Sequence, residues 1–320
     1  MSILAKKYFR DEAAAFAHLE GLLWPDGPIC PHCGTIGQAG RLQGVKGKNG
    51  KTRLGLWKCY SKGCRKQFTV KVGTVFECAH IPLHKMLQAV YLLSSSKKGI
   101  SSHQLHRALE VDYKSAWFLA HRIREAMRDG TLAPMGGMGT VIEADETFIG
   151  RVEGAPKVRH LRDKNMVMTL VERGGSARSF HMAGAAISDV MPIIRQNVAR
   201  ESRINTDEAK HYYDVGKEYA AHDTVKHKDE EYVRYTSDPS YTIGTNTVEG
   251  YYSIFKRGMK GIYQHCKEKH LHRYLAEYDF RYSNRVKLGI DDEARTVRAL
   301  QGITGKRLTY RGPRPNEIPF

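Results

Sequence analysis

Apolar and polar residues alternate along the middle of the chain in a way that predicts β-strands. Residues 140–150 (TVIEADETFIG), 164–175 and 177–185 each fit a strand, with a hairpin turn at Gly174-Gly175. The next segment, VMPIIRQNVAR, has helical spacing, and SRINTDEA fits another short strand that ends at acidic residues. Three strands, a helix and a further strand are the order expected of a mixed α/β domain.

A later segment, residues 245–261 (TNTVEGYYSIFKRGMKG), predicts an amphipathic helix. Its apolar residues recur at helical spacing on one face, formed by Val248, Tyr252, Phe255 and Met259. The opposite face carries Asn246, Glu249, Ser253, Lys256 and Lys260. Glu249 and Lys256 are two turns apart, so they point the same way and could both reach one ligand. Taken alone, a solvated helix face with a modest charge pair would give the same pattern.

The front of the chain contains three segments with helical spacing, at residues 83–96, 101–110 and 112–127, separated by the short stretches KKGI and VD. This layout is typical of a helix-turn-helix, although any three-helix packing unit would share it. The third segment has a predicted buried stripe of Ala116, Ala120, Ile123 and Met127. As in a recognition helix, the residues expected to face outward toward DNA are Lys114, His121, Arg122 and Arg124.

Four of the six cysteines occur as two pairs, in CPHCG and CYSKGC. With no export signal in the sequence, disulfides are disfavoured, and two cysteine pairs on glycine-containing turns suit tetrahedral zinc. The flanking stretches are rich in β-branched and aromatic residues, as the strands of a zinc ribbon would be. The expected ligands are Cys30, Cys33, Cys59 and Cys64. Cys78 and Cys266 lack partners at ligand spacing and are expected to behave as small hydrophobic residues.

The length of 320 residues allows two or three domains, at about 100–200 residues each. The glycine- and proline-rich stretch GTLAPMGGMG fits a linker between them. The predicted organisation is an N-terminal helix and zinc ribbon (1–80), a helix-turn-helix-like domain (81–130), a linker (131–139), an α/β domain (140–288) and a C-terminal tail (289–320).

Positive charge is concentrated in the front of the chain. Of the net charge of +17, most arises from residues 1–135, which hold 21 of the 51 Lys and Arg residues but only 9 of the 34 Asp and Glu residues. Such a basic region favours a polyanionic partner, of which nucleic acid is the commonest, although charge can also serve solubility alone. The hydrophobic content of 41%, and the lack of both a membrane-spanning apolar run and a signal-peptide pattern, predict a soluble cytoplasmic protein.

Three acidic residues stand out in the predicted α/β domain. Asp145 lies inside the first predicted strand on the same face as Glu143, Asp207 ends a later strand, and Glu249 lies on the helix of residues 245–261. A carboxylate inside a central strand is costly unless it is paired or bound to a cation. Two aspartates and a glutamate could together hold Mg²⁺, although scattered acids are common in α/β proteins.

Three stretches of the chain resemble the catalytic blocks of bacterial insertion-sequence DDE transposases, in the branch related to eukaryotic Merlin transposons. They are IEADETFIG, INTDEAKHYY and residues 245–285, which begin TNTVEGYYSIFKRG. The zinc ribbon and helices ahead of these blocks are similar to the same branch, so the resemblance covers roughly residues 15–285.

The resemblance implies an α/β, RNase H-like catalytic domain whose acids are Asp145, Asp207 and Glu249, with Mg²⁺ or Mn²⁺ as cofactor. Lys256 corresponds to the basic residue expected to contact DNA near the scissile phosphate, and Lys260 follows it on the same face. Secondary candidates are Asn246, a neighbour of the third acid, and His227, which with His222 resembles a histidine-bearing strand near the family's site.

The implied activity is metal-dependent DNA cleavage and strand transfer. The implied partners are the double-stranded terminal inverted repeats and target DNA, bound by a homodimer or larger assembly associated with the nucleoid. A catalytically silent, zinc-dependent DNA-binding regulator is one alternative, and a stand-alone nuclease of the same fold is another. The intact acids argue against the first alternative, and the long basic front of the chain favours a site-directed joining enzyme over the second.

Overall fold

The computed structural model describes residues 3–47, 50–128, 130, 133–155, 160–238 and 241–309. The chain divides into two compact units. The first comprises Met1–Ser96, Ile100–Met127 and Asp291–Phe320, and the second comprises Lys97–Gly99 and Arg128–Ile290. None of the helices in the described ranges combines the length and the apolar character needed to cross a bilayer.

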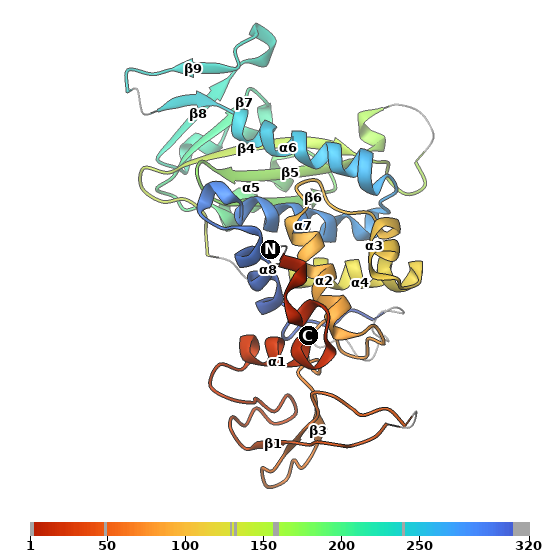
Figure 1. Cartoon of the computed structure of the whole chain (residues 1–320). Coiled ribbons are helices and arrows are strands. Elements are labelled where there is room, and N and C mark those ends of the chain that lie inside the picture. Colours follow the sequence, from red (N-terminus) through yellow and green to blue (C-terminus); the bar gives the residue numbers. More distant parts are fainter. Residues whose placement is uncertain are drawn as a thin grey trace. The chain divides into compact units, whose positions relative to one another are not determined.

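Two short 3-10 helices, η1 (Ile3–Ala5) and η2 (Lys7–Phe9), open the first unit. Helix α1 (Glu12–Leu23), whose N-terminus is capped by Asp11, follows them and leads into a small antiparallel sheet. The sheet contains β1 (Ala39–Arg41), β2 (Trp57–Cys59) and β3 (Gln67–Phe68) in that order (Figure 1). Its core includes Cys59 and Phe68, with Trp57 packed against them. The indole Nε1 of Trp57 donates to the nearly buried carboxylate of Glu20 on α1 at 2.9 Å, which attaches the ribbon to this helix.

The three predicted helical segments of this unit are confirmed as α2 (Leu83–Ser95), α3 (Ser102–Leu109) and α4 (Tyr113–Ala126). Ser101 and Gln104 form a capping box at the start of α3, and Asp112 caps α4 by accepting from the Ser115 N–H at 3.0 Å. Ser101 directly follows the connection KKGI and Asp112 ends the connection VD, so the boundaries follow from local chemistry.

The prediction that α4 presents His121, Arg122 and Arg124 outward is wrong, because all three side chains are buried. Only 1% of Arg124 is exposed, and a guanidinium nitrogen of Arg122 donates to the Glu77 carbonyl at 2.9 Å. The predicted stripe from Ala116 to Met127 is buried as expected. Helix α4 packs against α2, α3 and a further helix, so more of its surface is covered than one apolar stripe indicates.

That further helix, α8 (Asp292–Gln301), lies in the segment that the sequence analysis assigned to a tail. Its N-terminus is capped by Asp291, and Arg295 donates to the Ser94 carbonyl at the end of α2 at 3.1 Å. The proline- and arginine-rich end of the tail lies outside the described residues from position 310 onward. Residues from both ends of the chain therefore form the first unit.

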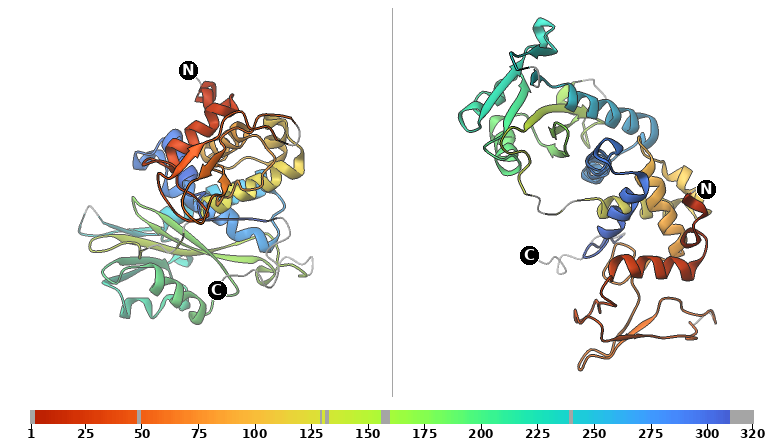
Figure 2. Two further views of the ribbon diagram at one scale, coloured as in Figure 1. Left: turned by 90° about the horizontal axis from the view of Figure 1, so that it is seen from below. Right: turned by 60° about the vertical axis from the view of Figure 1, so that its left-hand side comes forward.

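The second unit is built on a five-stranded mixed sheet with the order β6-β5-β4-β7-β8, whose green strands can be followed in Figure 2. Strands β4, β5 and β6 form an antiparallel meander. Strand β7 pairs parallel to β4, and β8 pairs parallel to β7. Their bounds are β4 (Val141–Ile149), β5 (Asn165–Glu172), β6 (Ala177–Met182), β7 (Arg203–Asp207) and β8 (Ala221–Val225). The mixed α/β fold predicted from the sequence is confirmed, with β4, β5, β6 and β7 as the four predicted strands.

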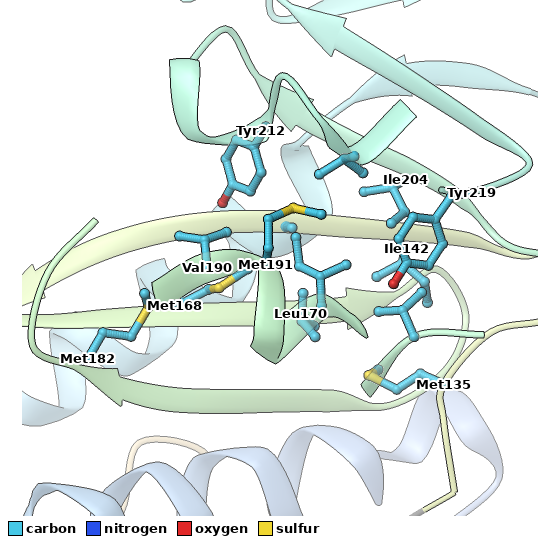
Figure 3. Close-up of a cluster of buried hydrophobic side chains, with 14 of the residues drawn as sticks. Met135, Ile142, Met168, Leu170, Met182, Val190, Met191, Ile204, Tyr212 and Tyr219 are labelled. Atoms are coloured by element: carbon cyan, nitrogen blue, oxygen red, sulfur yellow. The ribbon is translucent and has the colours of Figure 1, made fainter. Parts of the chain in front are cut away.

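The two faces of this sheet pack against different helices. One face presents Ile142, Ala144 and Leu170 to helix α5 (Ile187–Asn197), forming the methionine-rich cluster shown in Figure 3. The other face presents Val167 and Val171 to α6 (Asn246–Gly258) and α7 (Leu271–Ser283). Because side chains alternate along a strand, the odd-numbered acids of β4 face α6.

Helix α6 is preceded by a two-stranded ribbon of β9 (Val233–Tyr235) and β10 (Thr242–Gly244). Its apolar stripe is buried as predicted, whereas Glu249 and Lys256 are partly exposed and Lys260 is exposed. Beyond Gly258 the helix widens into a π-helical turn, η7 (Met259–Tyr263).

Candidate functional site

The four predicted zinc ligands of the first unit meet at one point. The Sγ atoms of Cys30 and Cys64 are 3.7 Å apart, those of Cys33 and Cys59 are 3.8 Å apart, and all four lie within 4.8 Å of one another. Tetrahedral coordination with Zn–S bonds of about 2.3 Å requires S···S separations of about 3.8 Å. The cysteines therefore form a possible zinc site with the correct dimensions.

Asp145 and Asp207 lie on neighbouring parallel strands of the second unit. The register pairs Glu143 of β4 with Asn205 of β7, so the side chains two residues further on, Asp145 and Asp207, follow on the same face. Helix α6 covers this face, and the hydroxyl of Tyr252 donates to the Asp145 carbonyl at 2.6 Å. Glu249, one turn before Tyr252, is thereby held over the same region of the sheet.

The two aspartates are electrostatically unfavourable in their ionised form. Burial, followed by the charge of Glu146 and smaller effects of Asp207 and Glu249, raises the pKa of Asp145 to about 7. The pKa of Asp207 is also raised, mainly by burial, despite the N–H that Ala209 donates to its carboxylate. An oxygen-rich group of this kind gains stability from a cation, and carboxylates are the ligands that Mg²⁺ prefers.

The three predicted acids interact, but they do not form a closed chelate. Among the described residues, the four cysteines are the one group of three or more candidate ligands whose atoms all lie within 4.8 Å of one another. The charges of Asp207 and Glu249 nevertheless both act on Asp145. The residue types therefore fit Mg²⁺, and Asp145 is the acid whose pKa the charges of the other two raise.

Glu143 positions α6, a role that the sequence analysis did not assign. Its carboxylate has no exposed surface and accepts the backbone N–H groups of Thr247 at 2.7 Å and Val248 at 3.0 Å. It also forms an ion pair with Arg173 at 2.6 Å, and Arg173 donates to the Gly244 carbonyl just before α6. The first turn of α6 is thereby fixed to β4, two residues before Asp145.

Replacing Glu143 with glutamine should lower the free energy of unfolding by about 2–3 kcal/mol. Breaking a buried pair typically costs about 3–5 kcal/mol, and the loss is smaller here because the Arg173 side chain is 24% exposed. Denaturant unfolding would measure the effect, with the exposed Glu201→Gln as matched control. Equal midpoints for the two variants would show that Glu143 does not hold α6 in place.

A second unassigned group surrounds Glu146. Its side chain, 8% exposed, lies 3.0 Å from Nε2 of His211 and also accepts a hydrogen bond from the Tyr212 hydroxyl. Burial lowers the pKa of His211, but the bond to Glu146 and the charges of Glu146, Asp207 and Asp145 raise it by more, so the net shift is upward. A positive imidazole ring would therefore offset part of the negative charge around the aspartates.

Lys256 and His227 both lie beside the carboxylates. Burial and two neighbouring lysines lower the pKa of Lys256, whereas the charge of Asp145 raises it, so the ammonium group lies within electrostatic reach of Asp145. Nε2 of His227 is 3.5 Å from the Glu249 carboxylate, which also accepts from the Thr245 hydroxyl at 3.0 Å. His227 is thus the better placed of the two histidines considered from sequence.

The remaining sequence candidates differ in their surroundings. His222 contacts the Thr206 hydroxyl at 2.9 Å, and Asn246 is exposed at the first residue of α6. In the first unit, Lys114 is exposed on α4 as predicted, whereas the burial of Arg122 and Arg124 removes them from any surface that could meet DNA in this conformation.

Two family models match the chain. Residues 136–283 match the ISXO2-like transposase domain and residues 10–67 match the transposase zinc-ribbon domain, whereas no curated protein matches. The first range contains all three acids and Lys256, and the second contains all four cysteines. Together the two ranges cover more than half of the chain, which therefore belongs to the insertion-sequence transposases with an N-terminal zinc ribbon.

Proposed function

We propose that this transposase binds the terminal inverted repeats of its DNA element, cleaves the DNA there and joins the freed 3′ ends to a target. Asp145, Asp207 and Glu249 are the proposed ligands of Mg²⁺ or Mn²⁺. The observation that carries the proposal is the aligned pair of partly buried aspartates on β4 and β7, whose raised pKa values favour a cation.

The bound ions would supply activation of a water or 3′-OH and stabilisation of the leaving oxygen. The residues of the chain hold the reacting groups in place. Glu143 and Tyr252 fix α6 over β4, so that Glu249 and Lys256 approach Asp145 from the same helix face. We assign Lys256 to the phosphate next to the cleaved bond and Lys260, one turn further on, to the following phosphate.

DNA binding by the first unit is assigned to exposed basic residues. Lys114 lies on α4, and the turn around the second cysteine pair exposes Lys62, Arg65 and Lys66. Their positive charge suits sequence-independent contact with phosphates, which would position the protein along the duplex. Because strand transfer requires two ends held together, a homodimer or larger assembly on DNA is part of the proposal.

The test is strand transfer of a labelled duplex that carries one end of the element into plasmid DNA, with Mg²⁺ or Mn²⁺. Wild type, Asp207→Ala and Glu249→Gln would be compared, with Glu201→Gln as matched control because Glu201 is exposed and precedes β7, whereas Asp207 ends that strand. Joined product is expected from wild type and the control alone, since the other two variants each lose a proposed metal ligand.

Two other outcomes would support the alternatives. A wild-type protein that binds the end tightly but neither nicks nor joins it would act as a DNA-binding regulator. A protein that nicks the end but never joins it to plasmid would be a nuclease of the same fold. Full activity of Asp207→Ala would contradict the proposed metal site.

A further inference from the structure

A cavity of about 650 Å³ opens in the second unit at the end of β4, where its lining begins at Phe148, three residues beyond Asp145. Its walls are the end of β4 with the residues up to Gly154 on one side, and the π-helical turn η7 with Gln264–Glu268 on the other. The volume falls within the range of about 300–1,000 Å³ that is usual for sites that enclose a small organic ligand. A nucleotide belongs to that size class.

The charged residues at this cavity favour an anion. Arg151, Lys164, Lys260 and Lys267 line it, and none of the four forms an ion pair with a described residue. Two acids, Glu153 and Glu268, also line it, but the Glu268 carboxylate already accepts the Glu153 N–H at 3.1 Å. Four cations without acidic partners around a concave surface attract phosphate groups.

The interior of the cavity is apolar in part, which distinguishes it from a plain phosphate site. Phe148, Ile149, Met259 and Leu271 contribute to its lining, and His265 stands at its edge. Bases that leave the duplex stack on aromatic and apolar side chains while the backbone follows a positive groove. The combination of apolar lining and basic rim therefore fits a nucleotide better than an inorganic anion.

Two lysines of the cavity link it electrostatically to the proposed reaction site. Lys164 and Lys260, which line the cavity, both act electrostatically on Lys256, and Lys256 also interacts with Asp145. A DNA strand whose phosphate lies at Lys256 would thus have its next phosphates within reach of Lys260 and Lys164.

The backbone of this wall departs from ordinary helical geometry. Helix α6 ends in the π-helical turn η7, and Gln264, which follows it, has φ +53° and ψ −54°. Both features are uncommon and occur preferentially at functional sites, because packing elsewhere must compensate for their cost. Here they turn the chain so that Gln264–Glu268 form the second wall of the cavity.

We propose that this cavity takes up one nucleotide of the DNA strand next to the cleaved phosphate, with its base unstacked from the duplex. The base lies against the apolar lining and its flanking phosphates contact Lys164 and Lys260. The inference rests on the proposed function, because it assigns the substrate strand that leads away from the carboxylate site.

Cys266 lines the cavity and offers a native probe for the test. Full-length Cys78→Ser protein, which lacks the exposed thiol outside the four-cysteine cluster, would be incubated without added Mg²⁺ with duplexes of the element's end. Each duplex carries a disulfide-tethered base at a different position. Capture should concentrate at adjacent nucleotides beside the cleavage point and disappear when Cys266→Ser is added to the same protein.

A second measurement tests the phosphate contact. Lys164→Gln should reduce the slope of log K against log salt by about 0.7–0.9, the value for one lost phosphate contact. The matched control is Lys287→Gln, an exposed lysine of the same unit that does not line the cavity, and its slope should equal that of wild type.

Uniform capture along the DNA, no capture by protein that is shown to bind the DNA, or equal slopes for the two lysine variants would overturn the inference. Neither measurement requires cleavage. Position-specific capture by a protein that never joins DNA would therefore refute the proposed function alone, and strand transfer without capture would refute the cavity's role alone.

Discussion

The Asp145→Asn variant is expected to lose strand transfer by about 10³-fold or more, while its metal-free form becomes more stable than wild type. Metal stabilisation of the reacting oxygens contributes several kcal/mol, and each 1.36 kcal/mol corresponds to about tenfold in rate. The gain in stability has a separate cause. Above a pH of about 7 the ionised Asp145 is held among other acids in a partly buried position, and asparagine removes that charge.

The stability of the metal-free protein should depend on pH through the protonation of Asp145. Because folding raises the pKa of Asp145 from 3.8 to about 7, the folded protein binds the proton more tightly, and stability falls as pH rises between these values. The variant should match wild type near pH 4 and exceed it by about 4 kcal/mol at pH 8, because the shift spans about 3 pK units at about 1.36 kcal/mol each.

Thermal unfolding without and with Mg²⁺ would check both parts. Added Mg²⁺ should stabilise wild type but not Asp145→Asn, because only a ligand that binds the folded state raises its stability. Asp214→Asn, which changes a partly exposed residue and loses only a surface pair with Lys217, provides the matched control. A variant that is less stable than wild type at pH 8 would contradict the electrostatic account of the site.

The second large effect is expected from the loss of zinc. Cys59→Ser should abolish zinc binding and unfold the segment between Cys30 and Phe68, because structural zinc contributes about 10–16 kcal/mol of binding free energy in zinc-finger peptides. The hydrophobic cluster of the ribbon is small and includes Cys30 and Cys59 themselves, so it offers little to replace the metal.

Zinc content per chain and limited proteolysis would measure this outcome, with Cys78→Ser as the control because Cys78 lies outside the cluster of four. New cleavage sites should appear within the ribbon only. DNA-end binding should weaken in the same variant if the ribbon carries part of the DNA contact. Retention of one zinc per chain by Cys59→Ser would contradict the four-cysteine site.

The elements that were predicted correctly from the sequence are those in which buried and exposed positions recur at a regular spacing. Strand β4 alternates because Ile142 and Ala144 pack toward α5 while Glu143 and Asp145 face α6. The apolar stripe of α6 is equally regular. Two cysteine pairs indicate one shared zinc ion, because structural zinc is bound tetrahedrally by four such ligands.

The orientation of α4 could not be predicted because its burial depends on elements far away in sequence. The helix contacts α2, α3 and α8, and long arginine side chains can bury their stems while their guanidinium groups reach backbone carbonyls. Arg122 does so at Glu77. The pattern of charged residues within one segment gives no information on where the contacting helices and carbonyl groups lie.

The candidate acids were found from the catalytic blocks, but their supporting residues were not. Glu143 is a positioning residue because the N–H groups of Thr247 and Val248 lie opposite it, more than a hundred positions later. Glu146 likewise meets His211 from a distant segment. The available signal was the density of acids in the stretch EADE, since a buried acid requires a partner.

The position of α8 sets an order of events during synthesis. Helix α2 emerges from the ribosome early, but the Arg295 side chain that binds its last turn is made only after the whole second unit. At about 5–20 residues per second, translation of Arg128–Ile290 takes on the order of ten to thirty seconds. During that interval α2 lacks its α8 partner, so a nascent or prematurely terminated chain exposes apolar surface that chaperones would recognise.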